Sequence, residues 1–259
     1  MRAEYESAVH QIMLNNQPNN KANPLWNKIV PDAEYDFFYS STDNSWHLTN
    51  KQKKCSNNEN NNIIVVLESP HKDEFNVNGD GLLPLFKDLN FNQYLGALIN
   101  GSQNLNPSQP TPLLNTGTIY KVYLVNAIQL QCSLGIPTEY YRDLVFLFYW
   151  DRLKSNFETR LKSYINDNTI AVINLCTQGR HECFHYIYNS STQKMEDIGS
   201  LCDNRFIQQV YDATSNCSSL QDLVQEYIEK VIVDMNMNIP YTTGTHPSIW
   251  HDAKKRIIR

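Results

Sequence analysis

The chain has 259 residues, of which 41% are hydrophobic, and this length fits one α/β domain with insertions, because single cores stop growing near ~250–300 residues. It holds no run of about 18 apolar residues and no hydrophobic segment after Met1, which argues against a membrane span and a signal peptide and predicts a soluble, cytoplasmic protein. The formal net charge of −5 argues against a broadly basic nucleic-acid binder, so any DNA site must be a local basic patch.

The N-terminal part of the chain does not alternate between strands and helices. Residues 4–14 could form a helix, and an Asn-rich stretch at 51–62 resembles an exposed linker. Between them lies an aromatic group that suggests a small accessory layer: Tyr35, Phe37, Phe38, Tyr39 and Trp46. We therefore expect an N-terminal accessory segment, residues 1–62, packed on a core domain of residues 63–259.

Short apolar runs in the core domain predict buried strands at residues 63–67, 121–125 and 170–175, with a weaker strand at 237–242. Such β-branched runs without strict alternation are typical of a parallel sheet covered on both faces. Helical spacing predicts helices at 138–164 and 218–234, and a Ser- and Asn-rich insertion at 188–204 is expected on the surface. Strands that alternate with helices predict a doubly wound α/β sandwich.

Polar residues follow each predicted strand. Glu68 comes after the first strand, Asn126 after the second, the segment Cys176-Thr177-Gln178-Gly179 after the third, and His246 after the fourth. Because ligands of open parallel sheets bind at the carboxyl ends of the strands, a carboxylate, an amide and an imidazole are expected at one edge.

These segments resemble the motifs of the uracil-DNA glycosylase superfamily. Leu67-Glu68-Ser69-Pro70-His71 is similar to its first motif and Thr245-His246-Pro247-Ser248 to its second, while the strand ending in Asn126 is similar to the one that ends in a base-reading Asn. The resemblance covers roughly residues 63–259. It implies a three-layer α/β/α sandwich with a four-stranded parallel central sheet, and a monofunctional DNA glycosylase that flips a base from DNA and hydrolyses its N-glycosidic bond, leaving an abasic site.

The resemblance also assigns catalytic roles. Glu68 matches the acidic position that orients water and stabilises positive charge on the sugar, and His246 matches the histidine that donates a hydrogen bond to the departing base. Asn126 matches the residue that reads the hydrogen-bonding edge of the flipped base. The alternatives are that Glu68 caps a turn, that Asn126 closes one, and that His246 is structural.

Other residues are expected to hold the DNA backbone or fill the gap left by the flipped base. Ser69 and Ser248 could bind phosphates, Ile249 and Trp250 fall where the family places an apolar wedge, and a basic cluster follows at Lys254, Lys255 and Arg256. A solvated helix face is the alternative for that cluster. The Pro-rich stretch at 106–112 resembles the DNA-compressing loop of the family, or is a plain linker.

Two departures from the family pattern concern the base pocket. Uracil-specific members carry a Tyr where this chain has His71, and the Phe platform for the base is replaced by Pro84, which leaves Phe75 or Phe86 as substitutes. A wider pocket predicts a 5-modified pyrimidine as substrate. Bacterial superfamily members that remove glucosylated 5-hydroxymethylcytosine from phage DNA resemble this chain and suggest an anti-phage role. Alternatives are a uracil-excising repair enzyme, a nucleoside or nucleotide N-glycosidase that needs no wedge, and a binding module.

No cofactor, metal or membrane partner is expected, and the chain is expected to act on DNA as a monomer. The six cysteines form no Cys-x-x-Cys pair, which argues against a redox centre or an iron–sulfur cluster. Cys176, His181, Cys183 and His185 could bind zinc, but on a helix His181 and His185 share a face from which Cys183 is excluded.

Overall fold

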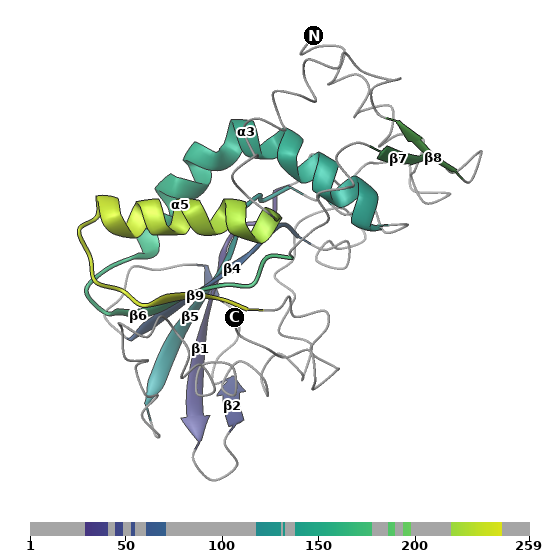
Figure 1. Ribbon diagram of the computed structural model, residues 1–259. Helices are drawn as coiled ribbons and strands as arrows, with labels where there is room; N and C mark the ends of the chain where they lie inside the picture. Colours follow the sequence, from purple (N-terminus) through teal and green to yellow (C-terminus); the bar gives the residue numbers. More distant parts are fainter. Residues whose placement is uncertain are drawn as a thin grey trace.

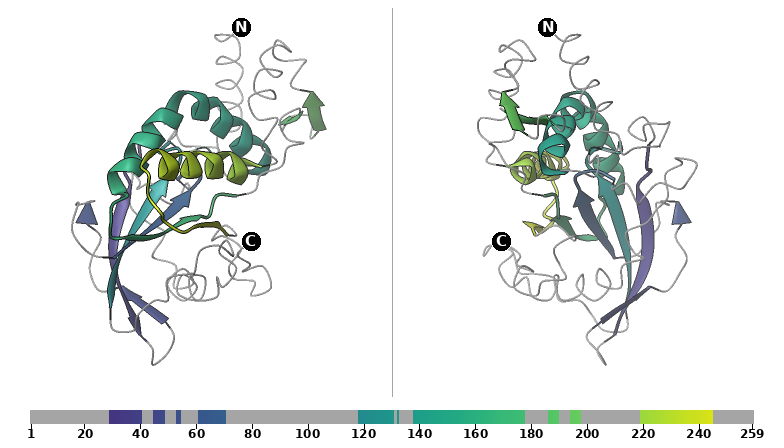
Figure 2. Two further views of the ribbon diagram at one scale, coloured as in Figure 1. Left: turned by 60° about the vertical axis from the view of Figure 1, so that its left-hand side comes forward. Right: turned by 90° about the vertical axis from the view of Figure 1, so that its right-hand side faces the viewer.

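The computed structural model describes residues 29–40, 45–48, 53–54, 61–70, 118–130, 132, 138–177, 186–189, 194–197 and 219–244. Its centre is a seven-stranded sheet in the order β2-β1-β5-β4-β6-β9, with β3 paired to β1 (Figure 1). Helices α3 (Thr138–Tyr164) and α5 (Leu220–Asp234) lie together on one face of this sheet (Figures 1 and 2). The α/β class expected from the sequence is confirmed.

Four strands of the sheet pair in parallel: β4 (Asn62–Leu67), β5 (Ile119–Asn126), β6 (Thr169–Asn174) and β9 (Tyr241–Thr243). β4 is the inner strand between β5 and β6, and its residues 63–66 have no exposed surface. Burial on both faces is why this run shows no alternation of apolar and polar residues. The strands predicted at 63–67, 121–125 and 170–175 are confirmed with small shifts of their ends.

The fourth predicted strand begins later than its sequence pattern indicated. Helix α5 starts after Ser219, whose side chain accepts a hydrogen bond from the Asp222 backbone N–H at 3.0 Å, and it ends where Asn236 takes a positive φ of 52°. The backbone N–H of Met237 then donates to the Ile232 carbonyl at 3.2 Å, so it is held by the helix. Only residues 241–243 remain for β9.

The described part of the N-terminal segment belongs to the same sheet. β1 (Ala33–Ser40) pairs antiparallel with β5, and β2 (Ser45–Leu48) and β3 (Lys53–Lys54) pair antiparallel with β1. A buried ion pair between Glu34 and Lys121, 2.8 Å apart, joins β1 to β5. The sheet is therefore larger than the four-stranded sheet that was predicted, and the expected aromatic layer contributes strands to it.

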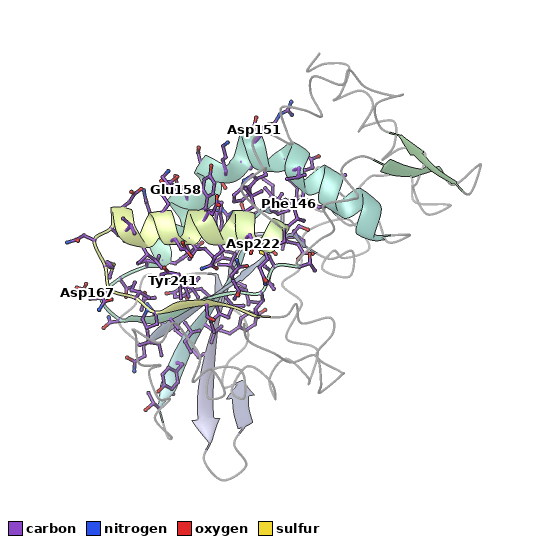
Figure 3. All side chains as sticks on the ribbon, in the orientation of Figure 1. Phe146, Asp151, Glu158, Asp167, Asp222 and Tyr241 are labelled. Atoms are coloured by element: carbon purple, nitrogen blue, oxygen red, sulfur yellow. The ribbon has the colours of Figure 1, made fainter. Side chains whose placement is uncertain are left out.

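The two helices pack against each other through aromatic side chains. Trp150 of α3 stacks on Phe146 with a centroid distance of 5.5 Å and meets the ring of Tyr227 of α5 edge-on at 5.0 Å. Figure 3 shows Phe146 directed into this core, whereas Asp151 points away from it. No helix within the described ranges combines the length and apolarity needed to cross a membrane.

Three further expectations concern the insertion at 188–204, the N-terminal helix and the third layer of the sandwich. Within the predicted surface insertion at 188–204, β7 (Tyr186–Asn189) and β8 (Lys194–Asp197) form an antiparallel pair. The helix predicted at 4–14 lies outside the described residues. A third layer stays a prediction, because both described helices cover the same face, although Ile63, Val65 and Val122 on the other face are buried.

Candidate active site

The carboxyl ends of the parallel strands meet at one edge of the sheet. In the strand register Leu67 pairs with Asn126, Val66 with Asn174, and Asn174 with Thr243. The described residues that follow these strands, Glu68, Ala127, Leu175 and Gly244, therefore lie at one edge. This agrees with the sequence prediction for the carboxylate of Glu68 and the amide of Asn126.

The strand order also marks where in this edge a ligand would bind. The chain runs from β4 to its neighbour β5 on one side and from β6 to its neighbour β9 on the other. The connections after β4 and β6 thus leave in opposite directions, and such a switch point is where doubly wound sheets bind their ligands. Glu68 follows β4, and Thr177 follows β6.

Glu68 is held at this switch point by both of its neighbours. Its carboxylate oxygen Oε2 accepts a hydrogen bond from the backbone N–H of Thr177 at 2.6 Å, and its carbonyl accepts one from Ile128 at 2.9 Å. The residue is only 5% exposed. A hydrogen bond from an N–H to a carboxylate is among the stronger kinds, so the position of this acid is fixed before any ligand arrives.

Asn126 brings an unsatisfied polar atom to the same edge. Its side-chain oxygen Oδ1 is buried and has no hydrogen-bond partner among the described residues, and the same is true of the Thr177 hydroxyl. A buried polar atom without a hydrogen bond destabilises the fold by about 1–3 kcal/mol, so such atoms are rare in native proteins and often mark a functional site. The Asn126 oxygen can accept a hydrogen bond from a ligand N–H or O–H, and the Thr177 hydroxyl can accept or donate one.

A buried network of amide hydrogen bonds connects the ends of β6 and β9 to helix α5. The side-chain nitrogen of Gln221, in the first turn of α5, donates to the carbonyls of Asn174, Cys176 and Gly244 at 3.3, 2.9 and 2.6 Å. Asn174 returns a bond to the Gln221 carbonyl at 2.9 Å, and its own side-chain oxygen accepts from the Cys176 N–H at 3.1 Å. The loops after β6 and β9 are therefore tied to each other through α5.

Three of the predicted site residues lie in the described part of the chain. Glu68 and Asn126 converge on one edge, and the half-exposed Ser69 follows Glu68 directly. The described chain ends at Gly244, whose N–H donates to the Asn174 carbonyl at 2.9 Å, two positions before His246. The remaining predicted residues lie outside the described ranges: His71, Phe75, Phe86, His246, Ser248, Ile249, Trp250, Lys254, Lys255 and Arg256.

Sequence reasoning assigned no role to Thr177 or Gln221. For Thr177 there was no signal beyond its place after a strand, because its contact with Glu68 runs through the backbone. Gln221 did carry a signal. It precedes Val224 and Ile228 at helical spacing, so an amide interrupts an apolar stripe, and such a buried polar side chain must find partners.

One residue of the alternative zinc cluster is described. Cys176 is fully buried, and this burial raises the pKa of its thiol well above the ordinary value, with a further contribution from the nearby Glu68 carboxylate. Metals bind the thiolate form, which these surroundings disfavour. His181, Cys183 and His185 lie outside the described residues, within which no group of three metal-binding side chains occurs.

We accordingly expect the purified protein to carry no stoichiometric metal and to keep its activity in EDTA. The reasons are the disfavoured Cys176 thiolate and the sequence spacing, which on the expected helix would turn Cys183 away from the face shared by the two histidines. Elemental analysis of the protein as isolated, beside an activity assay before and after chelation, checks this. One zinc ion per chain, or inactivation by EDTA that zinc reverses, would contradict it.

In comparisons with known proteins, no family model, no curated protein and no solved structure matches the chain.

Proposed function

We propose that the chain is a monofunctional DNA glycosylase of the uracil-DNA glycosylase superfamily. The observation that carries the proposal is that two groups lie at the same carboxyl edge of a parallel sheet. They are the fixed Glu68 carboxylate and the buried amide oxygen of Asn126, which has no hydrogen-bond partner among the described residues. A base that has left the DNA stack presents donors and acceptors on its edge, which an Asn side chain can match. The three-layer α/β/α arrangement around a four-stranded parallel core is part of this proposal.

In the proposed reaction, water attacks the C1′ atom of the sugar while the bond from C1′ to the base breaks. The electron pair of that bond goes to the base, and the oxygen of water bonds to C1′ and releases a proton. That proton neutralises the negative charge left on the departing base. Glu68 orients the water and lowers the energy of the positively charged sugar, as a carboxylate does best in a site that excludes water. His246 donates a hydrogen bond to the departing base, and Asn126 recognises it.

The substrate proposed is a 5-modified pyrimidine in DNA, such as glucosylated 5-hydroxymethylcytosine. The reason is the loss of a Tyr wall at His71 and of a Phe platform at Pro84, which widens the pocket near the 5-position. Polar residues that follow the first motif could then bind the added hydroxyl or sugar groups, and a site built for such groups rejects bases without them. An anti-phage role follows from this substrate.

Incubation with duplexes that differ only in one base tests the function and the substrate together. We expect abasic sites, detected by alkaline cleavage, on DNA with glucosylated hydroxymethylcytosine and much weaker release of uracil. Efficient release of uracil alone would contradict the substrate and leave a repair glycosylase. No release from any duplex, with turnover of a free nucleoside, would contradict the function itself.

A further inference from the structure

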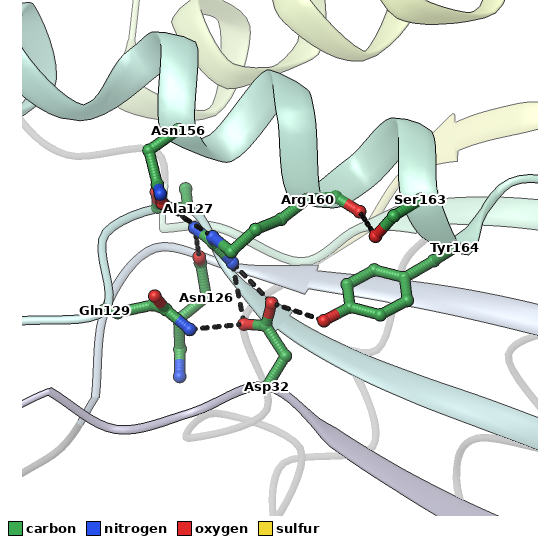
Figure 4. A network of polar contacts seen from close by, with 8 residues as sticks. All are labelled: Asp32, Asn126, Ala127, Gln129, Asn156, Arg160, Ser163 and Tyr164. Carbon is green, nitrogen blue, oxygen red and sulfur yellow. Dashed lines mark hydrogen bonds and ion pairs between the residues drawn. The ribbon is translucent and has the colours of Figure 1, made fainter. Parts of the chain in front are cut away.

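Next to the backbone of Asn126 lies a buried ion pair between Asp32 and Arg160, which joins the N-terminal segment to helix α3. Nη1 of Arg160 lies 2.7 and 2.6 Å from the two carboxylate oxygens of Asp32, and Tyr164 donates its hydroxyl to the same carboxylate at 3.1 Å (Figure 4). Nη2 of Arg160 donates to the carbonyls of Asn126 and Ala127 at 2.8 and 3.3 Å. One guanidinium therefore binds both the acid and the end of β5.

The same end of β5 is held from both sides. On one side, Ala127 and Ile128 donate their N–H groups to the carbonyls of Leu67 and Glu68 at 2.7 and 2.9 Å. On the other side, the Val30 N–H donates to the Gln129 carbonyl at 2.9 Å, and the Gln129 side chain donates to Asp32 at 3.3 Å. The turn that carries Asn126 is thus set between Glu68 and the N-terminal segment.

Stability alone is a weak reason for such a pair. The Asp32 side chain is 1% exposed and that of Arg160 is 14% exposed. Burial raises the pKa of Asp32, while the charge and hydrogen bonds of Arg160 act in the opposite direction. Because removing two charges from water offsets most of their attraction, well-packed apolar residues would often stabilise a fold as well or better. The geometry of the guanidinium fork supplies the better reason, since it fixes two backbone carbonyls and a carboxylate at once.

We propose that Asp32 and Arg160 are positioning residues that fix the place of Asn126 against Glu68 and thereby set which base the enzyme accepts. This rests on the proposed glycosylase function, and it gives the N-terminal segment, which lies outside the family resemblance, a part in the site. Neither residue touches the base. Their effect passes through the backbone of residues 126–128, which Arg160 and Glu68 hold from opposite sides.

Two variants and one matched control test the proposal. Arg160→Lys keeps the charge that Asp32 needs but loses the fork, and Asp32→Asn removes the charge at nearly constant shape. The control is Glu34→Gln. It weakens a second buried ion pair, that of Glu34 with Lys121, which joins β1 to β5 away from the carboxyl end of β5. Hydrogen exchange of the Ala127 and Ile128 amides reports the position of the turn, and kcat and KM for two different bases report discrimination.

We expect amide exchange at Ala127 and Ile128 to rise, and discrimination between bases to fall, ~10- to 100-fold in both variants, since small displacements of positioned groups have effects of this size. Glu34→Gln should change neither the amide exchange nor the discrimination between bases, even where it lowers thermal stability as much as the two variants do. Equal exchange in all three variants, or loosened amides with unchanged discrimination, would overturn the proposal. If the wild type releases no base from any duplex, the proposed function fails, and the exchange data still decide whether the pair positions Asn126.

Discussion

Glu68→Gln is expected to slow base release ~100-fold or more while the protein stays folded. The substitution removes the negative charge that, in the proposed mechanism, lowers the energy of the positively charged sugar. It keeps an oxygen that can accept the Thr177 N–H bond now made at 2.6 Å. Ground-state binding of DNA should therefore change little. Single-turnover rates on the preferred duplex, with thermal unfolding of the same samples, measure the two effects separately.

The matched control for this variant is Asp167→Asn. Asp167 is an exposed carboxylate in the turn before β6, at the opposite end of the strand from the candidate site (Figure 3). It should release base at the wild-type rate. His246→Ala is expected to lose activity as Glu68→Gln does, because in the proposed mechanism the histidine donates a hydrogen bond to the leaving base. A wild-type rate for Glu68→Gln would refute the proposed mechanism.

Gln221→Leu is expected to lower the free energy of unfolding by about 2 kcal/mol or more. The carbonyls of Cys176 and Gly244 lose this donor, at about 1–3 kcal/mol each, whereas the Asn174 carbonyl keeps its bond from the Gly244 N–H. The Gln221 amide is 5% exposed and donates to three carbonyls from two strand ends. Leu has a similar size, so the loss would come from these bonds rather than from a cavity. Urea unfolding followed by fluorescence gives the free energy.

Gln225→Leu is the control on the next turn of α5. Its side chain is half-exposed, accepts a bond from Asn174 at 3.1 Å and contacts Glu229 on the surface. Water can replace these partners, so we expect a loss of about 1 kcal/mol or less. If Gln221→Leu were no more destabilising than Gln225→Leu, the amide network would not be what joins the ends of β6 and β9.

The apolar strands show how much of this fold the sequence could predict. Residues 63–67 are a short β-branched run between polar residues. Such a run is typical of an inner strand that is buried on both faces. At 237–242 the same reasoning found a strand but placed its start too early. The end of α5 holds Met237 by a backbone hydrogen bond, and only residues 241–243 form β9. Sequence reasoning also missed β1 as part of the sheet, since antiparallel addition at an edge leaves no pattern within the chain itself.

By itself, the sequence determined the class of fold, the parallel strands and the convergence of Glu68 with Asn126, because a residue that follows a parallel strand must lie at the carboxyl edge of the sheet. Only the tertiary structure decided which groups hold them there. Asp32 and Arg160 are 128 positions apart, and Gln221 and Asn174 are 47 apart. Nothing in local spacing relates such residues, because their partnership depends on which strands and helices become neighbours when the whole chain packs.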